Sequence, residues 1–106
     1  MDRLYQMDED IENIQVEFHN RARELFFSLF REFNASIDGI SRRREEYQFR
    51  WQREQYINQL QNQLGVLAKE LLLRNESIKK SDLLSQNLRH FSQDYIHQFI
   101  QKINSL

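Results

Sequence analysis

A leucine seam with helical spacing constrains the fold of this chain more than any other feature of its sequence. Ile57, Leu60, Leu64, Leu67 and Leu71 follow one another at alternating spacings of three and four residues. Such spacing places them along one stripe of an α-helix, and a leucine stripe has to be covered by other helices. We therefore expect an all-α protein whose helices pack along seams of the coiled-coil type.

The composition favours a single helical domain. The 106 residues include no proline and two glycines, so the strongest helix breakers are nearly absent. A hydrophobic content of 40%, with 12% aromatic residues, is enough to form a core. The length suits one domain that spans residues 1–106.

Two breaks divide the chain into three predicted helices, at about residues 2–35, 41–75 and 82–105. Asp38-Gly39 suits the end of a helix, and Ser41 can cap the helix that follows. Asn75 and Ser81 mark the second break in the same way. The first break predicts a helical hairpin. A continuous helix through Gly39 is the alternative, because a glycine inside a helix costs only about 1 kcal/mol relative to alanine.

The lengths of these helices predict an elongated, antiparallel three-helix bundle with an uncovered end. At 1.5 Å per residue, the first two helices are about 50 Å long and the third only about 36 Å. The third helix then stops short of the hairpin end, where residues 27–52 hold much of the aromatic content. A large open apolar area normally marks an interface. We expect this end to dock on a second copy or on a different helical subunit, and the alternative is that its rings pack within the chain.

The predicted partner-binding residues are four aromatic residues and three arginines near this end, because Trp, Tyr and Arg dominate binding energy at interfaces. They are Phe27, Phe30, Tyr47, Trp51, Arg43, Arg44 and Arg50. Tyr47 and Trp51 are four residues apart and therefore neighbours on one side of a helix. The predicted function is a non-enzymatic protein-interaction, scaffold or adaptor subunit that acts by helix-on-helix docking.

The arginine-rich stretch from Arg42 to Arg53 supports an alternative function. Its guanidinium groups can contact phosphates while Tyr47 or Trp51 stacks on a base. However, Glu45, Glu46 and Glu54 dilute its charge. The chain has a net charge of -1 and a pI near 6.3, without the basic character of a nucleic-acid-binding domain. A small nucleic-acid-associated regulator is therefore the second candidate.

The sequence indicates no catalytic, cofactor-binding or metal-binding residues. It contains no cysteine, no glycine-rich phosphate loop and no nucleophile motif, so we expect no enzyme and no cofactor. His90, Asp94 and His97 share one side of the third helix. They lie opposite its apolar face, which predicts exposure to solvent rather than a metal site. His19 is isolated in the sequence and receives no role.

No stretch of the sequence predicts a membrane segment. The longest apolar run, residues 25–30, is far too short to cross a bilayer. The amphipathic stretch 23–33 carries Glu24 and Glu32 beside its arginines, which disfavours binding to anionic lipid. The acidic first residues are unlike a signal peptide, so we expect an intracellular, cytoplasmic protein. These acidic residues predict a solvent-exposed face of the first helix, and selection of a partner is the second interpretation.

Overall fold

The computed structural model describes residues 2–37, 46–75 and 81–105, and they form a bundle of three helices. The helices are α1 (Asp2–Ser36), α2 (Glu46–Arg74) and α3 (Ser81–Asn104), and each contacts the other two. The bundle measures 63 × 16 × 16 Å. Its radius of gyration, 17.2 Å, exceeds the value of about 13 Å for a compact domain of this size. The predicted elongated three-helix fold is confirmed.

The helical hairpin is also confirmed, and the continuous helix through Gly39 is wrong. Arg74 Nη2 of α2 lies 2.7 Å from Glu17 Oε2 of α1, and Arg21 Nη2 lies 2.9 Å from Glu70 Oε2. Glu17 and Arg74 are 57 positions apart, and in one straight helix this would separate them by about 85 Å. The turn at Asp38-Gly39, the cap at Ser41 and the predicted helix start at residue 41 lie outside the described residues.

The core lies between the three helices and contains the leucine seam. Leu60, Leu64, Leu67 and Leu71 of α2 are at most 3% exposed. The other buried residues come from α1 and α3: Ile11, Ile14, Phe18, Ala22, Phe26, Leu29, Phe33, Leu84, Leu88, Phe99 and Ile103. Among the described residues no buried side chain is polar, so the burial of apolar area is what stabilises the bundle.

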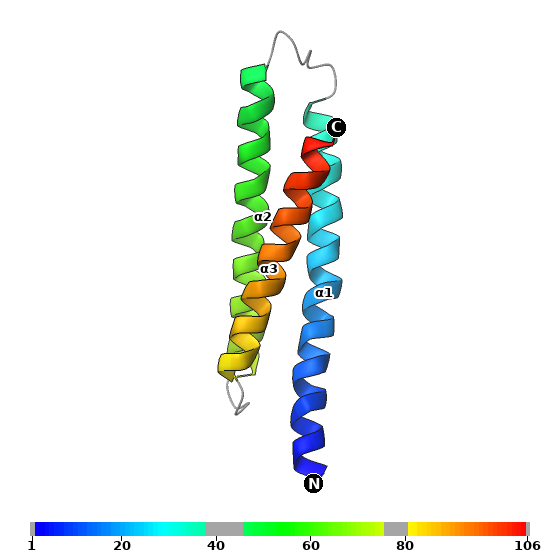
Figure 1. The fold of residues 1–106 in the computed structure, drawn as a ribbon, viewed down its shortest axis with the longest axis vertical. Coiled ribbons are helices and arrows are strands. Elements are labelled where there is room, and N and C mark those ends of the chain that lie inside the picture. Colours follow the sequence, from blue (N-terminus) through cyan, green and yellow to red (C-terminus); the bar gives the residue numbers. More distant parts are fainter. Residues whose placement is uncertain (1, 38–45, 76–80, 106) are drawn as a thin grey trace.

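α3 runs parallel to α1 and antiparallel to α2 (Figure 1). Near its middle, Tyr95 meets His19 of α1, and near its end Lys102 Nζ lies 4.7 Å from the ring centroid of Phe30. Arg53 Nη1 of α2 donates a hydrogen bond to Oδ1 of Asn104, the last residue of α3, at 3.1 Å. α3 therefore ends level with Arg53, before the first turns of α2.

At the opposite end of the bundle, α1 is the helix that extends furthest. Arg74, the last residue of α2, pairs with Glu17, and Ile11 and Ile14 are still buried in the core that the three helices share, so α1 extends past α2 only in its first turns. Figure 1 shows the first turns of α1 projecting past both other helices. None of the described helices has a segment long and apolar enough to span a membrane.

Candidate interaction surface

Exposed apolar side chains are the first indication of a surface that binds a partner. Among the described residues the large ones are Val16, Phe27, Tyr47, Trp51, Val66, Leu73 and Leu83. Of this set only Tyr47 and Trp51 are one helical turn apart, so that their rings are neighbours on one helix. Their side chains are 81% and 51% exposed. This pair is the best candidate for a docking surface.

The position of the pair follows from where α3 ends. Tyr47 and Trp51 precede Arg53, which holds the end of α3, so α3 does not extend alongside them. Phe49, between them in sequence, turns inwards, and its ring lies 5.7 Å from that of Phe33 in an edge-to-face arrangement. The start of α2 thus divides its rings between core and surface. The predicted uncovered end, residues 27–52, therefore holds three exposed rings, Phe27, Tyr47 and Trp51, while Phe33 and Phe49 in it are packed.

The other two predicted aromatic anchors lie elsewhere. The ring of Phe30 is half-buried, 6.3 Å from that of Phe99 and under the ammonium group of Lys102. Phe27 is 53% exposed, but at 100° per residue it lies on the side of α1 opposite the buried Leu29. It points away from the bundle on a different helix from Trp51. The structure therefore brings Tyr47 and Trp51 together and leaves Phe27 and Phe30 apart from them.

The predicted arginines divide in a similar way. Arg50 is exposed on α2, next to Trp51 in sequence, while Arg43 and Arg44 lie outside the described residues. Arg53 belongs to the contact between α2 and α3, where it bonds to Asn104 and where its Nε is buried without a hydrogen-bond partner. Its guanidinium is thus committed to the bundle. Of the predicted arginines, Arg50 is the one that the described structure places beside the aromatic pair.

α2 carries a second seam that the leucine pattern does not predict. It repeats at the spacings four and three, through Tyr47, Trp51, Glu54, Asn58, Gln61, Gly65, Ala68 and Leu72. Its part from Gln61 to Leu72 lines a groove between α2 and α3. The signal was present in the sequence as a heptad spacing, but its members are mostly small or polar, so a search for apolar periodicity passes over them.

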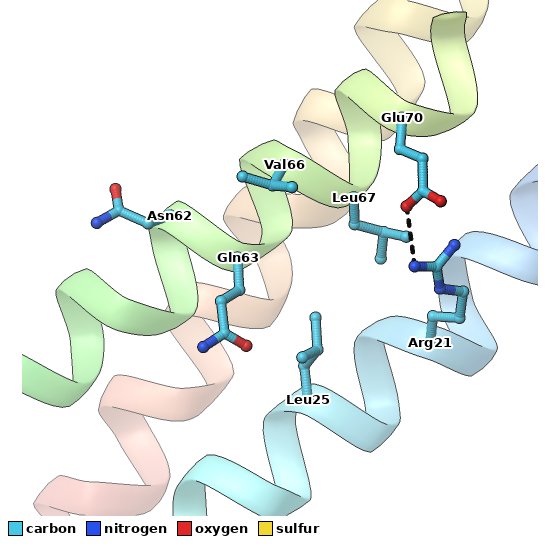
Figure 2. A pocket seen from close by; sticks show the side chains of 7 residues that line it. All are labelled: Arg21, Leu25, Asn62, Gln63, Val66, Leu67 and Glu70. Atoms are coloured by element: carbon cyan, nitrogen blue, oxygen red, sulfur yellow. Dashed lines mark hydrogen bonds and ion pairs between the residues drawn. The ribbon is translucent and has the colours of Figure 1, made fainter. Parts of the chain in front are cut away.

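A hollow between α1 and α2 has little chemical content. Figure 2 shows the side chains of Leu25 and Leu67 between the two helices, with Arg21 and Glu70 joined across one end and Asn62 turned away. The carboxylate of Glu70 is neutralised by this ion pair of 2.9 Å. No histidine lines the hollow, and its walls hold neither a hydroxyl nor a thiol. We assign it no chemistry.

His19 and His90 have close polar neighbours in the described structure. His90 Nε2 lies 3.8 Å from Asp94 Oδ2 on the exposed side of α3, as the sequence predicted. No group of three or more potential metal ligands occurs within the described ranges.

His19 has a tertiary contact that the sequence did not show, because its Nδ1 is 2.8 Å from the hydroxyl oxygen of Tyr95, 76 residues away. Burial, and then the charge of Arg23, lower the pKa of His19.

Comparisons of this chain with protein-family models, with curated proteins and with solved structures find no match.

Proposed function

We propose that this chain is a non-enzymatic interaction protein, a scaffold or adaptor subunit, that docks a helix of another protein on α2 at Tyr47 and Trp51, where α3 has ended. The observation that carries the proposal is the exposure of two large neighbouring rings at the end of the bundle that α3 leaves uncovered. Tyr and Trp are the residues most often found where binding energy concentrates. Both bury large area with only two side-chain torsions to immobilise.

The geometry of the pair suits a helix better than a small ligand. Two rings one turn apart on a convex helix form a ridge, and such a ridge packs into the groove of a facing helix. Trp51 is about half exposed and Tyr47 is 81% exposed, so the partner has to supply apolar side chains for both rings. Arg50 lies beside them and can select the partner through a carboxylate. The partner class is thus a helical protein with an apolar, partly acidic face.

The nucleic-acid alternative has weaker support. Its phosphate contacts would come from the arginines of the stretch from Arg42 to Arg53. Arg53 is engaged with Asn104, which leaves Arg50 as the exposed arginine in the described part of this stretch. The chain as a whole has a net charge of -1, without the basic character of a nucleic-acid-binding domain.

The test compares two pairs of exposed side chains on the same helix. The double variant Tyr47→Ala/Trp51→Ala removes the proposed anchors, and Val66→Ala/Leu73→Ala is the matched control, because both of its residues are exposed on α2. A partner is first captured from the source organism and identified by mass spectrometry, and its binding is then measured with purified proteins by calorimetry. We expect the first variant to bind at least about 30-fold more weakly, as for the loss of a hot spot worth 2 kcal/mol. The control should bind normally.

Two outcomes would contradict the proposal. One is equal binding by both variants, with unchanged helicity in each. The other is retention of DNA or RNA that is lost on Arg50→Ala and falls steeply between low and moderate salt, since release of counterions gives phosphate contacts this dependence.

A further inference from the structure

The groove between α2 and α3 carries cations that have no counter-charge in the described structure. Its rims hold Lys69 of α2 and Arg89 of α3, and no carboxylate lines it. Within the described ranges neither cation makes an ion pair. The contact between α1 and α2 is different, because there Arg21 and Arg74 are neutralised by Glu70 and Glu17. The α2–α3 groove is therefore an electropositive surface.

Four of the ten residues that line this groove have small side chains, beside the larger Leu72 and Ile96. They are Gly65, Ala68, Ser85 and Ser92. A Cβ atom added at Gly65 meets no other atom within 4 Å, so the packing of the chain itself does not require glycine there. Glycine within a helix is less favourable than alanine by about 1 kcal/mol. The helix axes of a packed pair approach more closely where the side chains at the contact are small. The groove thus has space for another helix.

The same sequence contains a helix whose charge complements the groove. The part of α1 from Asp2 to Glu12 includes Asp8, Glu9 and Asp10 and has Arg3 as its one basic residue. In the sequence, Leu4 and Met7 continue the apolar line of Ile11 and Ile14, which are buried in the bundle. The first turns project beyond the other helices, and so short a helical end gains little stability by itself. An electropositive groove would stabilise this acidic, amphipathic end.

The occupant has to be the α1 end of a second molecule. α1 is one helix from Asp2 to Ser36, so its first turns cannot fold back onto the same bundle. The residues that line the groove all belong to α2 and α3, and none belongs to α1. We propose that two copies of this chain associate end to end, with the acidic first turns of α1 from each copy lying in the α2–α3 groove of the other.

This arrangement closes on itself. In a two-fold dimer the contact of the α1 end with the groove occurs twice, once in each direction, and no further copy is required. Each groove then receives a fourth helix, which completes a four-helix arrangement around it. Tyr47 and Trp51 lie towards the other end of α2 and stay accessible. The dimer therefore does not depend on the function proposed for that pair.

A charge-exchange experiment tests the dimer. Lys69→Glu/Arg89→Glu reverses the groove, and Asp8→Lys/Glu9→Lys/Asp10→Lys reverses the α1 end. The mass is measured by size-exclusion chromatography with light scattering, and the monomer has a mass of 13.1 kDa. We expect the unmodified chain to form a dimer that dissociates more readily at high salt. Each reversed variant should dimerise at least about tenfold more weakly, because its like charges then face each other. An equimolar mixture should form a heterodimer, in which both contacts are again between opposite charges.

Two further variants distinguish a specific contact from a general effect of charge or misfolding. Gly65→Leu fills the groove without changing its charge and should yield a helical monomer. Arg23→Glu/Arg31→Glu, which reverses two exposed cations of α1, should leave the dimer unchanged. A monomeric unmodified chain at all concentrations, or a dimer insensitive to the groove variants, would overturn the proposal. If Tyr47→Ala/Trp51→Ala alone abolished the dimer, the groove proposal would fail while docking at the aromatic pair would stand.

Discussion

Replacing Phe33 by alanine tests whether the packed rings at the hairpin end stabilise the bundle. Phe33 is fully buried, and its ring lies edge to face with those of Phe49 and Tyr56, each at a centroid distance of 5.7 Å. Truncation of a buried phenylalanine to alanine costs about 3–5 kcal/mol, and two ring pairs place this site towards the upper part of that range. A domain of this size has a total stability of about 5–15 kcal/mol, so the variant should lose a large share of it.

Phe27→Ala is the matched control, because it removes the same side chain from the same helix at a position that is 53% exposed. We expect Phe27→Ala to cost about 1 kcal/mol or less, because substitutions of exposed residues have small effects. The part of this cost above zero comes from the lost contact with the ring of Phe26, whose centroid lies 5.3 Å away. Both losses are measured by urea unfolding with circular dichroism at low protein concentration. The dependence of unfolding free energy on urea should stay unchanged for both variants.

Equal losses for the two phenylalanine variants would refute this division of the rings between core and surface. Phe33→Leu adds a check on its cause, because leucine restores apolar volume without the ring contacts. It should recover part of the stability that Phe33→Ala loses. Full recovery would show that the edge-to-face pairs contribute nothing beyond the apolar area they bury.

Two further predictions concern the charged groups. The pKa of His19 is lowered from 6.5, so the unfolded chain binds its proton more readily, and stability that is complete above about pH 6.5 should decline as the pH falls below it. His19→Gln should weaken this dependence when unfolding is compared at about pH 8 and about pH 5. Arg74→Ala should cost only about 0.2–1 kcal/mol, because Arg74 and Glu17 are 53% and 40% exposed, and the loss should shrink in high salt. A loss at Arg74 that is independent of salt would contradict an ionic origin.

The three helices were predictable because the local signals agree with one another. The leucine seam, the scarcity of glycine and proline, and the polar breaks around Asp38 and Asn75 all point to the same division of the chain. The described helices differ from the predicted ranges by one residue or less at the ends that the structure describes. The position of a helix in the sequence and the face that it buries both appear as a periodic pattern of apolar residues, so the sequence alone predicts them.

The assignment of individual rings was not predictable to the same degree. Phe49 and Trp51 are two residues apart, but one packs on Phe33 and the other is half-exposed. This difference depends on the axial position of α3 relative to α2, which the contact between Arg53 and Asn104 shows. The bond between His19 and Tyr95 likewise depends on how α1 and α3 are aligned. Such offsets arise from packing between helices, and a single sequence has no periodic signal for them.

The second seam of α2 relates the two proposed surfaces to each other. Along this stripe the exposed rings occur where α3 has ended, and the small and polar residues occur where α3 lies alongside. From Trp51 to Gln61 the stripe rises by about 15 Å, so an occupant of the groove and a helix docked on the rings can be bound at the same time. An end-to-end dimer would place its two Tyr47–Trp51 pairs at opposite ends. A partner with two suitably spaced helices would then bind with a high effective concentration at the second site, so a modest affinity at each pair of rings is sufficient for tight assembly.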